Sequence, residues 1–273
     1  MGRRVRKNTI KRIRAHIVEG RGKGAGPSYK PAIYTYEIPS RGKVARMKGE
    51  TTGRVHHCLS QLEKNYLIML DYDPLVSDIC EQYSLDLEDT LLISAMTGIE
   101  HPHADQTPTV MTTDFLYCKN GNWHASAIKT TEDLNNERTK EKLEIERIYW
   151  ECFEIPWETI TEEDIPQPLV TNLVWLHSGE SLEKLIPDES NRKNIISSFL
   201  ELYQNHSVPF SDIVNVTESY CHLVPGTMMQ VFKSQIREGA IQLDLSKPID
   251  FYEPRNIAQL GYTKAMPLPG KEG

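Results

Sequence analysis

The sequence predicts a mixed α/β domain built around a central sheet, followed by a mostly helical domain of winged-helix type. Strand-like segments and amphipathic helices alternate up to about residue 160, and two of the strands are joined by an Asn-Gly turn. A proline-punctuated stretch at residues 156–168 then separates this pattern from a run of helices. The 273 residues suffice for one large domain or two ordinary ones.

The elements of the first domain follow from the spacing of its apolar residues, which is helical in some segments and alternating in others. Helices are expected at residues 3–19 (short and basic), 59–70, 85–97 and 135–153. Strands are expected at residues 32–38, 78–83, 111–118, 123–130 and 155–160. Residues 20–27 are too rich in glycine for either and are predicted to form a flexible basic loop.

The second domain is predicted to be three or four helices and a β-ribbon. Its expected helices span residues 169–177, 191–205, 210–218 and 225–238. Residues 241–245 alternate like a strand and return through Pro248 to residues 251–252, as the wing of a winged helix would. We therefore divide the chain into a basic arm and strand region of the first domain, its core, a winged-helix-like domain and a flexible tail: residues 1–56, 57–165, 166–260 and 261–273.

The formal charge of −7 conceals a strong asymmetry along the chain. Residues 1–56 hold 15 of the 31 Lys and Arg and three acidic residues, a charge of +12, so the remainder carries −19. A basic arm on an acidic body is typical of proteins that contact nucleic acid, although a solvated tail or a localisation signal has the same composition. The acidic second domain favours a protein partner over a DNA duplex.

Composition narrows the class further. Five cysteines are scattered, odd in number and never spaced as CxxC, which argues against a disulfide framework or zinc ribbon and fits a reducing cytoplasm. No apolar run reaches the ~18 residues that a membrane span needs, and no apolar segment follows the basic start as in a signal peptide. We expect a cytoplasmic protein with no membrane partner.

Three residues form the outline of a metal-dependent phosphodiesterase. Asp114 lies inside a predicted strand, where acids are depleted, and the hairpin brings it near Lys129 at one sheet edge. Glu63 lies on the apolar stripe of a predicted helix, where a buried carboxylate needs a cation or donor. Carboxylates hold Mg²⁺, and a lysine can orient the attacking water or stabilise the transition state. The alternatives are a cross-strand ion pair and a glutamate that reaches solvent.

Several motifs carry a family resemblance. They are EGRGKGAG at residues 19–26, TGRVHH at 52–57, LSQLE at 59–63, TTDFL at 112–116, Ile128-Lys129, and NERTKEKLEIERIYW at 136–150. Together they resemble the TnsA endonuclease subunits of heteromeric cut-and-paste transposons, over about residues 10–178 and more weakly beyond.

This resemblance implies a restriction-endonuclease-like core followed by a winged-helix domain. It implies Mg²⁺-dependent cleavage at the 5′ ends of a transposon, with two ions and Mn²⁺ as a substitute. The implied partners are transposon-end DNA, a TnsB-type transposase that cuts the 3′ ends, and a TnsC-type AAA+ regulator bound by the C-terminal part. Glu63, Asp114 and Lys129 match the catalytic set, and Glu146 matches a further acidic position.

One position departs from the family pattern. The residue two before the lysine is an acid or glutamine in the wider family and is Ala127 here, which cannot ligate metal through its side chain. Glu63, Asp114 and the Ile128 carbonyl would then hold the ion, with waters. A catalytically silent architectural subunit and a promoter-binding winged-helix regulator remain alternatives. The DNA backbone is expected to contact Arg12, Arg21, Lys23, Arg41, Lys43, Arg46, Arg54, His56 and His57.

Overall fold

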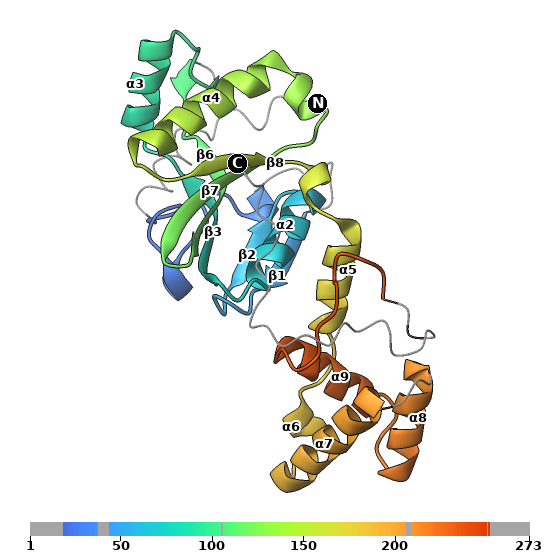
Figure 1. The fold of residues 1–273 in the computed structure, drawn as a ribbon. Helices are drawn as coiled ribbons and strands as arrows, with labels where there is room; N and C mark the ends of the chain where they lie inside the picture. Colours follow the sequence, from blue (N-terminus) through green and yellow to red (C-terminus); the bar gives the residue numbers. More distant parts are fainter. Residues whose placement is uncertain (1–18, 38–43, 105, 206–208, 250, 252–273) are drawn as a thin grey trace. The chain divides into compact units, whose positions relative to one another are not determined.

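A computed structural model describes residues 19–37, 44–104, 106–205, 209–249 and 251. It divides into two compact units, Met1–Ile165 and Pro166–Gly273, each of which is described by itself (Figure 1). The helix expected at residues 3–19, the tail at 261–273, and the candidate DNA contacts Arg12, Arg41 and Lys43 lie outside the described residues, apart from Glu19.

The first unit is built on a mixed four-stranded sheet in the order β3-β6-β7-β8. Its strands are β3 (Val76–Ser84), β6 (Thr112–Lys119), β7 (Asn122–Ile128) and β8 (Trp157–Ile160). The first three are antiparallel neighbours, and β8 pairs parallel to β7. The helices are α2 (Gln61–Asp71), α3 (Leu87–Thr97) and α4 (Glu137–Cys152). Two short antiparallel pairs complete the unit: β1 (Ala45–Lys48) with β2 (Val55–Cys58), and β4 (His103–Ala104) with β5 (Thr107–Pro108). The predicted mixed α/β core is therefore confirmed.

Local sequence explains where the main elements begin and end. In the β6–β7 turn, Asn120 and Gly121 both have positive φ, 51° and 78°, as a tight hairpin requires. The Ser60 side chain caps α2 by accepting a hydrogen bond from the Glu63 amide. Asp86 caps α3 in the same way, and left-handed Gly98 ends it.

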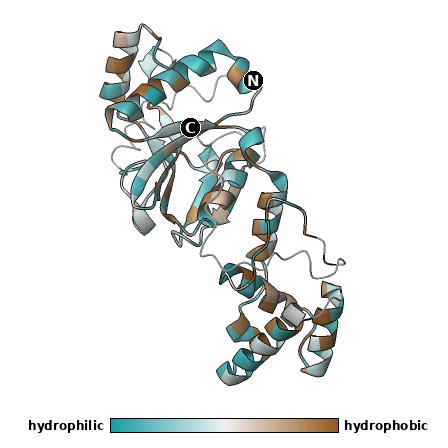
Figure 2. Cartoon of the chain, in the orientation of Figure 1, coloured by the Kyte–Doolittle hydropathy of each residue, from teal (hydrophilic) through white to brown (hydrophobic). Residues whose placement is uncertain are grey.

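The two faces of the sheet pack against different helices. Ile145 and Trp150 of α4 join Leu116 in one buried cluster. Tyr66 of α2 packs instead on Phe115, the neighbour of Leu116, with ring centroids 5.7 Å apart. Since adjacent strand residues point to opposite faces, α2 and α4 cover opposite sides of the sheet. Figure 2 shows the resulting alternation of hydrophobic and hydrophilic residues along the helices.

The predicted strand at residues 32–38 is wrong. Its described part holds only a short 3-10 helix, Thr35–Glu37, because the Ala32 amide bonds to the Gln82 carbonyl and no ladder forms. The glycine-rich segment is a loop, with a 3-10 helix at Gly26–Ser28. At Gly22, a Cβ would lie 2.1 Å from the Ser84 hydroxyl oxygen, so only glycine fits against the end of β3.

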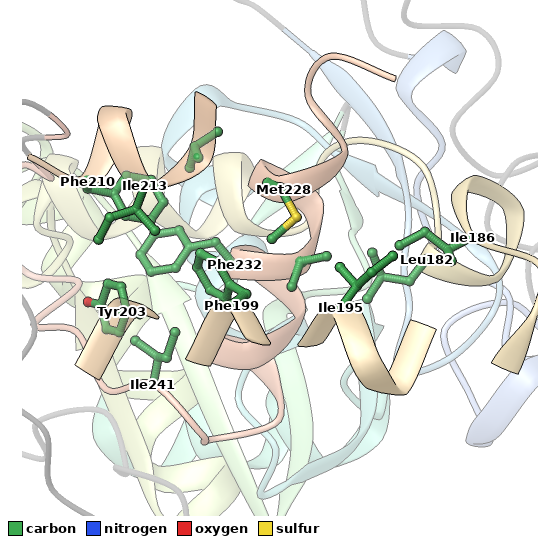
Figure 3. Packing of buried hydrophobic residues seen from close by; sticks show 12 residues of the cluster. Leu182, Ile186, Ile195, Phe199, Tyr203, Phe210, Ile213, Met228, Phe232 and Ile241 are labelled. Atoms are coloured by element: carbon green, nitrogen blue, oxygen red, sulfur yellow. The ribbon is translucent and has the colours of Figure 1, made fainter. Parts of the chain in front are cut away.

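The second unit is helical. It contains α5 (Gln167–Leu176), α6 (Leu182–Leu185), α7 (Glu189–Asn205), α8 (Phe210–Tyr220) and α9 (Thr227–Arg237). Phe199, Phe210 and Phe232 form the centre of one hydrophobic core (Figure 3). The helices expected from the sequence are thus present, with boundaries shifted by a few residues.

The strand expected at residues 241–245 does not form, so the winged-helix prediction is not supported by the described part of this unit. Ile241 is instead buried in the helical core. The carbonyls of Leu245 and Lys247 accept hydrogen bonds from the Asn172 side-chain amide, at 2.8 and 2.7 Å, rather than from a partner strand. Within both units, the described helices are too short or too polar to cross a lipid bilayer.

Candidate active site

The candidate site lies where strands β6 and β7 separate. Their backbone pairing runs from the turn to Phe115 and Ser126 and then stops, while β7 continues alongside β8. At the separation, the Asp114 side chain takes the place of a backbone acceptor: Oδ2 accepts a hydrogen bond of 2.7 Å from the Ile128 amide. The carboxylate is thereby held between the two strands.

Lys129 lies beside this carboxylate, as the predicted hairpin requires. Its Nζ donates to Asp114 Oδ2 and to the Ile128 carbonyl, both at 2.8 Å. Burial alone would lower the pKa of Lys129, but the charge and hydrogen bond of Asp114 outweigh it and raise the pKa. The lysine therefore stays protonated and can act as a fixed positive charge and hydrogen-bond donor.

Glu63 reaches the same place from the first turn of α2. Its Oε2 accepts a hydrogen bond of 2.8 Å from the Leu59 amide, and the backbone amide of Glu63 donates to the Ser60 hydroxyl. The residue is 7% exposed, so it does not reach solvent as a stripe-edge glutamate would. Burial, followed by repulsion from the Asp114 charge, raises the pKa of Glu63 to about 7.

Gln82 of β3 joins the two carboxylates, and the sequence analysis did not identify it. Its Nε2 lies 3.4 Å from Glu63 Oε2 and 3.2 Å from Asp114 Oδ1. The residue is 2% exposed. Its backbone φ is positive, at 50°, which is uncommon for a residue other than glycine. A glutamine in a predicted strand carries no signal of this role, because only the fold brings it near Glu63 and Asp114.

Glu146 of α4 is buried behind the site. Its Oε1 accepts hydrogen bonds from the Thr113 hydroxyl and, at 3.0 Å, from Trp157 Nε1. Burial, followed by the Asp114 charge, raises its pKa to about 7. Its hydrogen bonds are to side chains of β6 and β8, so Glu146 lies inside the domain.

The donor set fits a hard divalent cation. The carboxylates of Glu63 and Asp114 both face Gln82 Nε2, and Lys129 Nζ joins Asp114 to the Ile128 carbonyl. Carboxylate and carbonyl oxygens are the ligands that Mg²⁺ prefers. Burial and then the nearby Asp114 charge raise the pKa of Glu63, and a cation at this place would offset both by favouring the charged carboxylate. Among the described residues, no three His, Cys, Asp or Glu side chains are grouped to hold one ion. A metal here would therefore depend on carbonyl oxygens or waters as well.

Three of the expected DNA contacts are engaged inside the domain instead. His56 and His57 lie on strand β2, and they are 0% and 8% exposed. Arg54 donates to both oxygens of Glu81, at 2.9 and 2.6 Å, and stacks on Tyr29. His56 Nδ1 and the His57 amide bond to the same carboxylate. The Arg54 and His56 side chains and the His57 amide thus bind Glu81, while His57 Nδ1 lies 3.1 Å from the Thr35 hydroxyl. These polar groups are partnered inside the domain, and contact of the three residues with DNA stays a prediction.

The remaining described basic residues differ in availability. Arg21 forms ion pairs with Glu19 and Glu37, at 2.6 and 2.8 Å, and its side chain is 12% exposed. Lys23 and Arg46 are exposed. Of the predicted backbone contacts that the structure describes, Lys23 and Arg46 are those presented to solvent, and the Lys23 amine lies 5.6 Å from the centroid of the Tyr83 ring.

Comparison of the sequence with known proteins identifies a family. Residues 73–162 match the model of the TnsA-like endonuclease N terminal, and residues 164–245 match that of the TnsA endonuclease C terminal. The chain is 42% identical over 174 residues to the transposon Tn7 transposition protein TnsA of Escherichia coli. That match covers 63% of this chain and 64% of the relative's own length. On these matches, the chain belongs to the TnsA endonuclease family.

Proposed function

We propose that this protein is the metal-dependent endonuclease subunit of a transposase, which cuts the 5′ strands at the ends of a transposon. In this proposal a TnsB-type transposase cuts the 3′ ends, and a TnsC-type AAA+ regulator binds the C-terminal unit. The observation that carries the proposal is the meeting of Glu63, Asp114 and Lys129 from three separate elements at the point where β6 and β7 part. The family membership supports the same reaction class.

Each residue has a role that its contacts allow. Glu63 and Asp114 would hold Mg²⁺ or Mn²⁺, with the Ile128 carbonyl as a further oxygen donor. Such an ion supplies a Lewis acid that neutralises charge on the scissile phosphate and makes hydroxide available at neutral pH. The protonated Lys129 amine would donate hydrogen bonds to the attacking water or to a phosphate oxygen. Lys23 and Arg46 would contact the DNA backbone, positioning it without reading its sequence.

The test is strand nicking on a transposon-end duplex with the TnsB-type transposase, the regulator and Mg²⁺ present. Asp114→Asn keeps the shape of the side chain and an oxygen for the Ile128 amide, yet it removes the charge that binds metal. We expect its nicking rate to fall at least a hundredfold, whereas Lys140→Met on the exposed face of α4 should nick like the parent. An Asp114→Asn rate equal to that of the parent would refute the site.

A catalytically silent architectural subunit is the second candidate, and Ala127 is the observation that favours it. This position, 0% exposed, offers no side-chain oxygen to the site. Calorimetry with Mn²⁺ separates the two proposals, because a silent subunit would bind no metal at this site even with transposon-end DNA bound.

A further inference from the structure

Gln82 stands at an irregular point of the central sheet. Its neighbours pair regularly with β6, Glu81 with Phe115 and Tyr83 with Thr113, but Gln82 itself takes a left-handed conformation. Such a conformation is unfavourable for a residue other than glycine and persists where the surrounding structure enforces it. Here it coincides with an amide side chain that is buried against the two carboxylates of the candidate site.

The side-chain amide of Gln82 has two ends, and both are partnered. Nε2 faces Glu63 and Asp114, at 3.4 and 3.2 Å, while Oε1 accepts a hydrogen bond of 3.3 Å from the Thr112 hydroxyl. A hydroxyl can donate or accept. If the amide turned by 180°, Thr112 would accept from Nε2, and Oε1 would face the carboxylates. Thr112 therefore has a partner in either orientation.

The two orientations suit two states of the site. Without a cation, an N–H donor toward two carboxylates is favourable. With a cation between the carboxylates, an N–H group would face positive charge, whereas a carbonyl oxygen would be a ligand of the type that Mg²⁺ prefers. The usual side-chain position for a further ligand is vacant in this chain, because residue 127 is alanine. In the described structure, the Ile128 carbonyl already accepts from Lys129 Nζ at 2.8 Å.

We propose that Gln82 supplies a third side-chain oxygen to the metal, through its turned side-chain amide, in place of the ligand missing at Ala127. This inference rests on the proposed metal-dependent function. The ligand would then come from Gln82 on β3, whereas the family pattern has it at the position of Ala127 on β7. Thr112 is the positioning residue that partners the amide in both states.

Calorimetric titration with Mn²⁺ of the full chain bound to transposon-end DNA tests the proposal. Gln82→Met keeps the length and burial of the side chain but removes its oxygen. We expect it to weaken Mn²⁺ binding about tenfold or more. Gln82→Glu, which keeps an oxygen, should bind at least as tightly as the parent. The matched control is Gln61→Met on α2, an exposed glutamine bonded to Asn65, and its affinity should not change.

A second measurement tests whether Gln82 binds the metal directly or only supports the two carboxylates. In a chain labelled with ¹³C and ¹⁵N at glutamine, the Gln82 side-chain carbonyl signal, assigned by its loss in Gln82→Met, should shift when Mg²⁺ is added. If the parent binds Mn²⁺ but Gln82→Met binds it equally well, or if the Gln82 carbonyl signal stays in place, the Gln82 inference fails and the proposed function stands. If the parent itself binds no metal, the proposed function fails first. Unchanged circular dichroism of each variant shows that a lost affinity is not lost folding.

Discussion

Replacing buried Glu81 by glutamine should destabilise the first unit by about 3–5 kcal/mol, the usual cost of breaking a buried ion pair from one side. Glu81 is 0% exposed, and the Arg54 side chain is 9% exposed. The carboxylate accepts two hydrogen bonds from Arg54, one from His56 and one from the His57 amide. Glutamine offers one acceptor oxygen in place of two and turns an amide N–H toward the guanidinium, so the Arg54 charge is left buried without an opposite charge.

Urea unfolding followed by tryptophan fluorescence measures this loss. Three tryptophans, Trp123, Trp150 and Trp157, lie in the first unit, and Trp175 lies in the second. A Trp175→Phe background therefore makes the fluorescence report the first unit. The matched control is Glu144→Gln, which breaks an exposed ion pair with Arg147 and should cost less than about 1 kcal/mol.

The comparison between these two ion pairs can refute the reasoning. If Glu81→Gln loses no more stability than Glu144→Gln, then the buried contacts of Glu81 do not hold Arg54 and β2 in place. In that case Arg54, His56 and His57 would be free to leave Glu81 and contact DNA.

Three more outcomes follow from burial and charge. Burial would raise the pKa of Glu81, but hydrogen bonds from His56 and Arg54 outweigh burial and lower the pKa to about 2. The stabilisation from Glu81 is therefore fully present above the unfolded pKa of ~4.3 and is lost as pH falls toward 2. The urea midpoint of the parent should fall over that window more steeply than that of Glu81→Gln. Burial raises the pKa of Glu146 to about 7, so this residue should reduce the stability of the folded chain as pH rises from ~4.3 to 7. Glu146→Gln should make this decline smaller, measured as the difference between urea midpoints at pH 5 and pH 8. Phe199→Ala should cost about 3–5 kcal/mol in the second unit alone, measured as lost hydrogen-exchange protection in α7 with α4 unchanged.

The placement of Asp114 beside Lys129 was predictable because a tight turn fixes strand register. The Asn-Gly turn sets the pairing of β6 with β7, and the two side chains, 15 positions apart, meet at 2.8 Å. An acid inside an apolar strand and a lysine at the end of its partner were therefore informative together. Helical spacing placed Glu63 on the apolar stripe of its helix but left open whether its carboxylate reached solvent, and it gave no sign of the meeting with Asp114.

The burial of His56 and His57 was not predictable from local sequence. Basic residues in a basic segment are usually exposed, and the four-residue strands β1 and β2 are too short for an alternating pattern to emerge. Both residues bind the buried carboxylate of Glu81, which lies on β3 more than 20 positions away in the sequence. Nothing in the sequence around Glu81 indicates that it is buried. Contacts of this range depend on the fold and leave no periodic signal.

The left-handed conformation of Gln82 on β3 lies opposite a point where the neighbouring strand β6 changes the face to which its side chains point. In a regular strand, residues two apart face the same side, yet Phe115 packs on α2 while Thr113 bonds to Trp150 and Glu146 of α4. The change of side occurs at Asp114, opposite Gln82. Asp114 thereby lies between a carboxylate from α2 and one from α4, and it influences the pKa of both. A regular pleat would keep Thr113 and Phe115 on one face, so the strain at Gln82 and the gathering of acids around Asp114 belong to the same structural feature.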